Sequence, residues 1–460
     1  MLKTIFLLQF GLLLTFSCGA QNTLGRWYSK ITINDTVRHY LLDFRANDAE
    51  YAGYIDIPSA NTFRVRLDTV GLDDQDSVYF SHSGLNLSFK GRLNENTALI
   101  QGAFSVEDYI GDLMFSRKPQ VSRTQIIEEP LPYHSHDIYF YNSENTRLAG
   151  TLSLPKDQKE FPVVVLISGS GPQNRDEEIL GHRPFGILAD YLTRQGVAVL
   201  RYDDRGYGES EGQFRPATSL DYTDDALAAV QYLESNYAQQ ITQIGLVGHS
   251  EGGNIAPVAA TRNPNIDFLV LLAAPGLSNY ESYLVSLDII LQAYPETYDR
   301  DFPFFKSVYY DMATISDKAI LKDSLQAKFS RITKLMSEEE LLIYGGADNY
   351  IKGQVDYHTS DWYHYYLQFD VTPYLANLEI PILALNGDQD DSVESKSNLR
   401  GIKETLIKAG NLNFETVELK NVNHFFQESD NNSIESVYFN EVTFQIAALE
   451  KIAAWISQLN

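Results

Sequence analysis

One serine lies in the setting that a nucleophile requires. The segment Gly248-His249-Ser250-Glu251-Gly252 matches the pattern G-x-S-x-G, follows the apolar run Gly245-Leu246-Val247, and opens a segment of helical character. Glycines are needed there because a sharp strand-to-helix turn leaves no room for side chains two positions before and after the nucleophile. We therefore expect Ser250 to attack acyl carbons. The N–H of Glu251, at the start of the helix, would face the resulting oxyanion.

A serine hydroxyl needs a base, and imidazole suits this task because its pKa lies near neutrality. Of the nine histidines, His424 follows the last strand-like run. It also completes the chain order of serine, acid, histidine that is typical of such sites. The acidic loop Asp388-Gln389-Asp390-Asp391 precedes it, and Asp390 is the predicted partner of His424. Asp388 and Asp391 stay open as alternatives, with helix capping as their structural explanation.

A glycine-rich loop supplies the second half of the expected oxyanion hole. The segment Ser168-Gly169-Ser170-Gly171-Pro172 ends the first long apolar run. The backbone N–H of Ser170 or Gly171 would hold the oxyanion together with that of Glu251. A flexible turn is the structural alternative, and the same loop is a rival nucleophile loop that lacks the five-residue elbow. His249, within the elbow itself, is expected to point away from the reaction.

Two further clusters of polar residues receive structural interpretations. In the loop Arg201–Ser210, Asp203 and Arg205 are expected to pair and to fix the loop beside the site. The segment His134-Ser135-His136-Asp137 hints at a metal, but its spacing suits no ligand set, so a solvated linker is the preferred interpretation.

These residues need a scaffold, and the alternation of apolar runs with helical segments from residue 137 onward predicts a mostly parallel sheet with helices on both faces. Between residues 277 and 376 the alternation stops, which predicts a helical lid. The expected strands and helices are Asp137–Tyr141, Leu148–Leu154, Val163–Ile167, Val197–Tyr202, Ile244–Val247, Phe268–Ala273, Ile382–Asn386 and Phe414–Leu419 for strands, with Pro184–Arg194, Leu220–Asn236, Glu251–Thr261, Lys396–Ala409 and Val442–Gln458 for helices.

The first quarter of the chain has a different pattern. Short alternating runs separated by Gly, Asn and Asp predict a small antiparallel β domain, a sandwich or partial barrel, over residues 21–118. Prolines 119, 130 and 132 indicate an extended linker over residues 119–134. Residues 135–460 would then form the domain that carries the chemistry.

Composition limits partners and location. The net charge of −25 disfavours nucleic acid, because it would repel phosphate. Residues 1–20 carry Lys3, a short apolar run and small residues, which indicates an export signal too short to span a membrane. Either the signal is cleaved after Ala20 or Cys18, the single cysteine, carries a lipid anchor, the one membrane contact expected. The protein is thus expected to be periplasmic, extracellular or lipid-anchored.

The combined motifs resemble those of a known superfamily. From about residue 135 to 460 the chain resembles the α/β-hydrolases, and more narrowly the bacterial serine esterases with S-G-S-G-P, Y-D-x-R-G-x-G-x-S, G-H-S-E-G-G, G-x-x-D and N-H-x-F-Q. This resemblance implies an α/β-hydrolase fold, a triad of Ser250, Asp390 and His424, and a short-acyl carboxylic ester as the small-molecule substrate. It also implies that Trp362 and Tyr363 line the substrate pocket, and that the reaction needs neither a metal nor an organic cofactor.

Two other functions stay open. A serine peptidase or amidase would use the same triad, although the aromatic segment from Tyr280 to Phe305 favours apolar acyl or alcohol groups. A surface binding protein could retain the scaffold without catalysis, because a fold does not imply a function. The simultaneous presence of elbow, acid, base and oxyanion loop argues against this third function.

Overall fold

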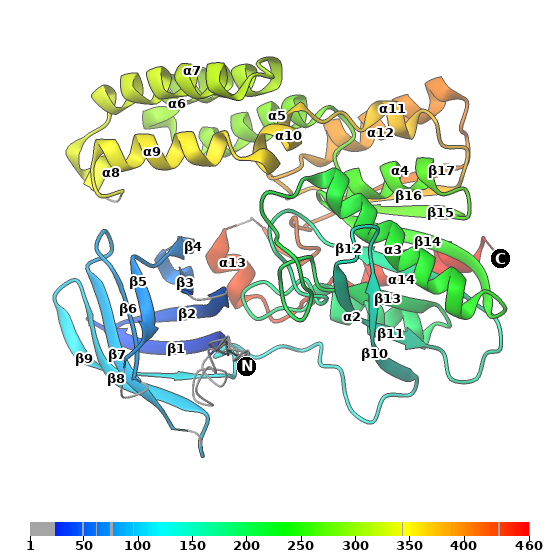
Figure 1. The fold of residues 1–460 in the computed structure, drawn as a ribbon, viewed down its shortest axis with the longest axis horizontal. Helices are drawn as coiled ribbons and strands as arrows, with labels where there is room; N and C mark the ends of the chain where they lie inside the picture. Colours follow the sequence, from blue (N-terminus) through cyan, green and yellow to red (C-terminus); the bar gives the residue numbers. More distant parts are fainter. Residues whose placement is uncertain are drawn as a thin grey trace, which may run out of the picture. The chain divides into compact units, whose positions relative to one another are not determined.

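The computed structural model describes residues 24–47, 50–60, 62–73, 77–94, 96–342, 344–430 and 433–459. Its chain divides between Gln120 and Val121 into two compact units, each with its own sheet (Figure 1). The predicted export signal, with Cys18 and Ala20, lies outside the described residues.

The first unit is a nine-stranded antiparallel sheet with the order β4-β3-β2-β1-β9-β8-β7-β6-β5. Every pair of neighbours except β1 and β9 is also consecutive along the chain. The strands are β1 (Gly25–Ile33), β2 (Thr36–Asn47), β3 (Glu50–Ile57), β4 (Thr62–Arg66), β5 (Thr69–Leu72), β6 (Ser77–His82), β7 (Leu87–Asn94), β8 (Leu99–Val106) and β9 (Tyr109–Ser116), with a short 3-10 turn η1 (Pro58–Ala60). The predicted all-β domain is confirmed.

Alternating burial explains why these segments are strands with one inner face. In β7, Leu87 and Phe89 are buried while Ser88 and Lys90 are exposed. The sheet curls, since β3 and β5 are in contact and the N–H of Leu67 donates to a β3 carbonyl oxygen at 2.9 Å. The enclosed core is aromatic and aliphatic, and includes Trp27, Tyr40, Leu42, Phe44, Ile55, Val78, Phe80, Phe89, Phe104 and Phe115.

The second unit contains an eight-stranded sheet with the order β10-β11-β13-β12-β14-β15-β16-β17. The strands β10 and β11 pair antiparallel, β11 pairs antiparallel with β13, and all following pairs are parallel. Their bounds are β10 (His134–Tyr141), β11 (Arg147–Leu154), β12 (Phe161–Ile167), β13 (Ala198–Tyr202), β14 (Ile241–His249), β15 (Phe268–Leu272), β16 (Ile382–Gly387) and β17 (Phe414–Leu419). His134 and His136 therefore begin the edge strand β10, which corrects the expectation of a solvated linker.

Helices cover both faces of this sheet (Figure 1). In the buried strand β12, Val163 and Val165 face a core shared with α3 and α4, whereas Val164 and Leu166 face a core shared with α2 and α14. The helices outside the insertion are α2 (Pro184–Arg194), α3 (Ser219–Tyr237), α4 (Gly252–Arg262), α12 (Ser395–Ala409), α13 (Ile434–Phe439) and α14 (Ile446–Ser457). This architecture is the predicted α/β-hydrolase fold.

A helical insertion separates β15 from β16, as predicted. Its interior buries Met312, Leu325, Phe329 and Val355, and α6, α7 and α9 lie side by side (Figure 1). Its elements are α5 (Asn279–Gln292), α6 (Pro295–Thr314), α7 (Lys318–Ile332), η2 (Thr333–Leu335), α8 (Glu338–Leu342), α9 (Ala347–His358), α10 (Asp361–Gln368) and α11 (Thr372–Leu375). Across the described residues, we find no helix with the length and hydropathy to span a bilayer.

The segment between the two sheets is extended but not free. It has no helix or strand between Ser116 and His134, as its prolines predict. From residue 121 onward it binds the C-terminal part of the second unit: the N–H groups of Thr443 and Phe444 donate to the side-chain oxygen of Gln125 at 2.9 and 2.8 Å. Part of the predicted linker is therefore hydrogen-bonded to the second unit.

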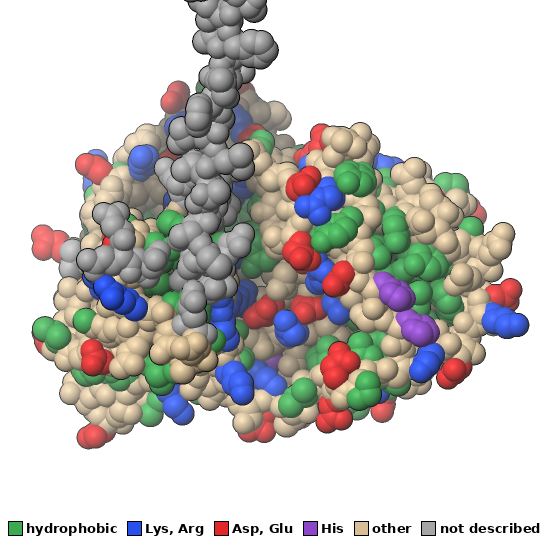
Figure 2. Space-filling model, turned by 60° about the horizontal axis from the view of Figure 1, so that its bottom comes forward, with side chains coloured by type: hydrophobic (Ala, Val, Ile, Leu, Met, Phe, Trp, Pro, Cys, Tyr) green, Lys and Arg blue, Asp and Glu red, His purple; other side chains and the backbone are tan. Residues whose placement is uncertain are grey.

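Side chains of both charge signs are mixed on the face drawn in Figure 2. Acidic and basic groups alternate there over short distances instead of gathering into one basic patch.

Candidate functional site

Ser250 sits in a strained turn between β14 and α4. Its φ of +52° lies in the left-handed region that non-glycine residues seldom adopt, and its N–H donates to the carbonyl of Leu272 at 2.9 Å. A side chain at Gly248 would overlap the carbonyl oxygen of Gly252, and one at Gly252 would overlap that of Ile167. The tight turn predicted from G-x-S-x-G is present, for the steric reason given.

His424 and Asp390 lie together. Nδ1 of His424 is 2.8 Å from Oδ2 of Asp390, and the Asp390 carboxylate is fully buried. The other carboxylate oxygen accepts the N–H groups of Ser392 and Val393 at 2.9 and 2.8 Å. A carboxylate held in this way orients the imidazole ring of His424 and selects its tautomer.

The loops that carry the acid and the base support each other. Asp388, one of the two alternatives to Asp390, accepts the N–H of Asn421 at 2.7 Å and so holds the histidine loop. Asp391, the other alternative, accepts a hydrogen bond from the Ser392 hydroxyl. A side chain at Gly387 would overlap the carbonyl oxygen of Val422, so the close approach of the two loops requires glycine there. Asp390 is the carboxylate that the fold brings to the histidine.

The glycine-rich loop after β12 passes over the nucleophile. A Cβ at Gly169 would lie 3.1 Å from Cβ of Ser250, and Gly171 has a φ of +92°. Within the described part of the chain, the N–H groups of Ser170, Gly171 and Glu251 have no protein acceptor. Those are the three donors predicted for an oxyanion hole, whereas the N–H of Gly169 is already bonded to Glu177.

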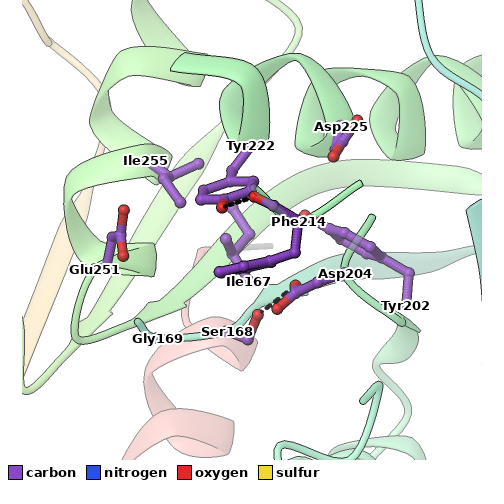
Figure 3. A pocket seen from close by; sticks show the side chains of 10 residues that line it. All are labelled: Ile167, Ser168, Gly169, Tyr202, Asp204, Phe214, Tyr222, Asp225, Glu251 and Ile255. Atoms are coloured by element: carbon purple, nitrogen blue, oxygen red, sulfur yellow. Dashed lines mark hydrogen bonds between the residues drawn. The ribbon is translucent and has the colours of Figure 1, made fainter. Parts of the chain in front are cut away.

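Carboxylates from the loop after β13 hold this glycine-rich loop in place (Figure 3). Asp204 accepts the Ser168 hydroxyl at 2.7 Å and the Gln173 N–H at 2.8 Å. Burial raises the pKa of Asp204 well above its ordinary value. Asp204 thus fixes the glycine-rich loop, which carries two of the predicted oxyanion donors.

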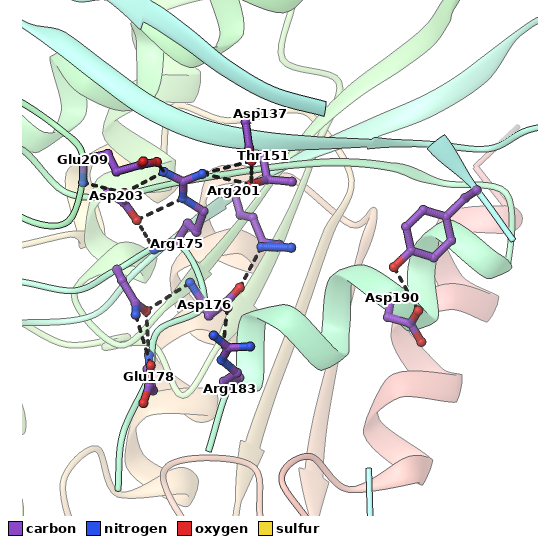
Figure 4. A network of polar contacts seen from close by, with 12 residues as sticks. Asp137, Thr151, Arg175, Asp176, Glu178, Arg183, Asp190, Arg201, Asp203 and Glu209 are labelled. Atoms are coloured by element: carbon purple, nitrogen blue, oxygen red, sulfur yellow. Dashed lines mark hydrogen bonds and ion pairs between the residues drawn. The ribbon is translucent and has the colours of Figure 1, made fainter. Parts of the chain in front are cut away.

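The ion pairs next to this loop correct one expectation. Asp203 does not pair with Arg205 but with Arg175, whose Nη2 is 2.7 Å from Oδ2 of Asp203 (Figure 4). Arg205 instead binds Asp225 with two bonds of 2.6 and 2.7 Å. Asp203 and Arg205 therefore both bind partners from distant segments. Through these two ion pairs the loop after β13 connects Arg175, beyond the glycine-rich loop, with Asp225 of α3.

Glu251 contributes a buried carboxylate as well as a backbone N–H. The carboxylate accepts the Ser219 hydroxyl of α3 at 2.6 Å and the Trp362 indole N–H of α10 at 3.0 Å. Burial raises the pKa of Glu251. The carboxylate therefore ties the start of α4 to α3 and to the helical insertion at the carboxyl end of the sheet.

A small pocket lies behind the glycine-rich loop and in front of α3 and α4 (Figure 3). It has carboxylates from three segments and an aromatic wall, and is lined by Ile167, Ser168, Gly169, Tyr202, Asp204, Phe214, Tyr222, Asp225, Glu251 and Ile255. Within the described chain, no three His, Cys, Asp or Glu side chains converge in a way that could hold a metal ion.

Trp362 and Tyr363, the predicted pocket residues, are buried in an aromatic cluster of the insertion. The Tyr363 ring lies 5.4 Å from that of Trp362 and 5.9 Å from that of Tyr283. Through Trp362 this cluster reaches Glu251, next to the nucleophile. Their contact with substrate stays a prediction.

Sequence reasoning missed Glu177. This buried residue directly follows Asp176, and Oε1 of its side chain is 2.8 Å both from the N–H nitrogen of Gly169 and from Nδ1 of His249. His249 does turn away from the nucleophile's reacting side, toward Glu177 and the carbonyl of His424. A single acidic residue in a loop has no spacing signature, so only the fold could reveal it.

A known protein family matches part of the second unit. The family described as "Serine aminopeptidase, S33" matches residues 183–424, more than half of the chain and the whole stretch from α2 to His424. The chain belongs to this family. Its matched segment contains Ser250, Asp390 and His424.

Individual relatives are more distant. The chain is 24% identical over 309 residues to a protein named Esterase EstD from Thermotoga maritima. The matched stretch covers 67% of this chain and 65% of the relative. The chain thus spans slightly less than two thirds of that relative. An esterase structure from Pyrococcus furiosus covers 74% of this chain and 98% of its own at 16% identity, with a TM-score of 0.44. Est1E from Butyrivibrio proteoclasticus, solved with ferulic acid, covers 69% and 98% at 18% identity, with a TM-score of 0.41.

Proposed function

We propose that the protein is a serine hydrolase of short-acyl carboxylic esters. The observation that carries the proposal is the 2.8 Å contact between His424 and a fully buried Asp390, on the loops beside the strained turn of Ser250. A solvated histidine would not need such a partner. Esterase EstD, to which two thirds of the chain is similar, supports the choice of an ester substrate.

In the proposed mechanism, Nε2 of His424 takes the proton of the Ser250 hydroxyl as the serine oxygen attacks the acyl carbon. The N–H of Glu251, with that of Ser170 or Gly171, stabilises the oxyanion. His424 then protonates the leaving alcohol, which leaves an acyl-enzyme on Ser250. Water, activated by the same imidazole, releases the acid and restores the serine.

A serine aminopeptidase is the second candidate, because the matching family is described by that activity. Ser250, with the same acid and base, would attack an amide in place of an ester, and the acyl-enzyme would again form on Ser250. The two candidates differ in the leaving group and in whether a free amino group on the substrate is needed.

The decisive experiment compares both substrate classes on one plate. We expect the purified protein to hydrolyse p-nitrophenyl acetate and butyrate faster than the octanoate, and aminoacyl p-nitroanilides slowly. Ser250→Ala should lower kcat by about 10⁴-fold or more, because the nucleophile is lost. Ser307→Ala, which removes a hydroxyl bonded to the Phe304 carbonyl within α6, is the matched control and should keep full activity.

Each outcome has a clear meaning. Fast anilide turnover that Ser250→Ala abolishes would replace the esterase by the aminopeptidase. Equal and negligible rates for the wild-type protein and the variant, on both substrate classes, would refute the hydrolase proposal.

A further inference from the structure

A buried carboxylate–imidazole pair lies directly behind the proposed triad. Glu177 and His249 are both about 5% exposed, and Oε1 of Glu177 is 2.8 Å from Nδ1 of His249. The proposed mechanism uses neither side chain. Glu177 has a φ of +50°, a strained conformation for a residue other than glycine. Strain of this kind persists where the surrounding structure holds a residue in place.

The pair bonds to two parts of the proposed machinery at once. Nε2 of His249 is 2.9 Å from the carbonyl oxygen of His424, the proposed base. The N–H of Gly169, in the loop that covers Ser250, donates to the same Glu177 oxygen that faces His249. One continuous chain of bonds therefore runs from the glycine-rich loop through Glu177 and His249 to the backbone of the catalytic histidine.

Hydrogen-bond roles fix the protons of this chain. A carbonyl oxygen only accepts, so Nε2 of His249 must carry a proton to bond with His424. The N–H of Gly169 donates to Oε1 of Glu177 as well, and a proton between this oxygen and Nδ1 of His249 completes a charge-assisted pair. Burial alone would lower the pKa of His249, but Glu177 and the more distant charge of Asp390 raise it above its ordinary value.

The surroundings strengthen these bonds. The pocket on the far side of the pair is lined by Pro184, Phe185, Leu272, Phe425, Phe426 and Phe444, besides Glu177 and His249. Such an apolar wall keeps the local dielectric low, so charge-assisted bonds are stronger and the loss of one partner is costly. The titratable groups that face His249 are Glu177, the His424 ring at 4.9 Å between centroids, and Asp390.

We propose that Glu177 and His249 are positioning residues for catalysis: together they hold the backbone of His424 and the glycine-rich loop at the separation that the transition state requires. This inference rests on the proposed function of Ser250 and His424. A merely structural pair would stabilise the fold without affecting the rate of the chemical step.

The first variant is Glu177→Gln, which keeps the shape of the side chain but removes its charge. The amide cannot serve both neighbours: an oxygen that keeps the Gly169 N–H offers no donor to Nδ1 of a neutral His249, and an NH2 group that donates to Nδ1 leaves the Gly169 N–H without its acceptor. We expect kcat to fall about tenfold to a hundredfold with KM within about twofold, because the positions of reacting groups are affected more than binding. Activity of the variant should also decline at a lower pH than that of the wild type, because the substitution removes the charge of Glu177 that raises the pKa of His249.

Two substitutions of His249 separate the two ends of the chain of bonds. In His249→Asn the amide nitrogen replaces Nδ1 and still faces Glu177, whereas in His249→Gln it replaces Nε2 and still faces the His424 carbonyl. We expect the Gln variant to retain more activity, because it keeps the bond that locates the base. His182→Gln is the matched control, since His182 is equally buried and bonds Thr443 and Val437. This control should lose stability and keep its kcat.

The readout is the rate at which a fluorophosphonate probe labels Ser250, measured with ester kcat and KM and with thermal unfolding of every variant. Labelling needs an activated serine but no particular substrate. Wild-type labelling rates in Glu177→Gln and both His249 variants would overturn the positioning role and leave the proposed function intact. A wild-type protein that labels no faster than Ser250→Ala would overturn the proposed function, and the positioning role with it.

Discussion

At the scale of single residues, Gly169 lies against both Ser250 and the Glu177–His249 pair. A methyl group there would lie 3.1 Å from Cβ of Ser250 and 3.4 Å from both Oε1 of Glu177 and Nδ1 of His249. Its neighbours are a strained nucleophile and a bonded pair, so none can yield freely. We predict that Gly169→Ala lowers kcat about tenfold or more, as measured by ester hydrolysis at saturating substrate.

Gly353 provides the control for this prediction. It lies in α9, and a Cβ there would meet open space. Gly353→Ala should leave kcat unchanged and increase stability slightly, by about 0.4–1 kcal/mol, because alanine restricts the unfolded chain. Equal activity of the two alanine variants would mean that the loop over Ser250 can move without consequence.

The residues that could be predicted from the sequence are those with a local signature. Ser250 lies in a five-residue motif, and His424 and Asp390 follow it in a fixed chain order. Glu177 has no such signature, and Arg205 found its partner 20 residues away in Asp225 instead of in the adjacent Asp203. Bonds across loops depend on how the loops pack, and spacing alone does not determine that.

At the scale of secondary-structure elements, Glu251 joins α3, α4 and α10 through one buried carboxylate. Burial raises its pKa above the ordinary value of 4.5, so the native protein keeps this proton at pH values where the unfolded chain has lost it. The contribution of Glu251 to stability is therefore full below about pH 4.5 and is lost as pH rises through the native pKa.

Replacing this carboxyl by an amide removes the titration. We predict that the free energy of unfolding of Glu251→Gln rises relative to that of the wild type from pH 4.5 to 8, because only the wild type loses stability through ionisation of this group. Urea unfolding of both proteins at several pH values measures this difference. The contributions of the other carboxyl groups to the pH dependence are common to both proteins and cancel. A difference that does not change with pH would show that Glu251 has an ordinary pKa.

Elements were predictable where a residue marks their ends. Pro184 at the first position of α2 and the run Val163–Ile167 in β12 place both elements at the predicted positions. The six-residue helix α13 was missed, since such a short helix shows less than two turns of periodicity. In the β domain the sequence indicated short alternating strands without their pairing, and the described residues form a nine-stranded sheet in which β1 pairs with β9.

At the scale of the whole molecule, the two units have separate cores. All proposed catalytic residues and the bonds that hold them lie after residue 120. We predict that a chain of residues 121–460 folds and keeps kcat/KM within about threefold of the full protein. A chain of residues 135–460 lacks the Gln125 bonds to Thr443 and Phe444 and should unfold at a lower temperature. Loss of activity in the longer fragment would show that the β unit contributes to the site.

The strand order of the β unit has one more consequence. Its first and last strands, β1 and β9, are partners in the middle of the sheet, while the consecutive strands β4 and β5 form its two edges. Consecutive strands other than β4 and β5 form antiparallel hairpins. Because β1 and β9 pair, the chain enters and leaves the unit side by side. Such a unit can be removed, moved to a loop of another protein or circularly permuted by joining β9 to β1 and opening the chain near Leu67, without rearranging a strand. Its strand pairing is thus complete within the unit.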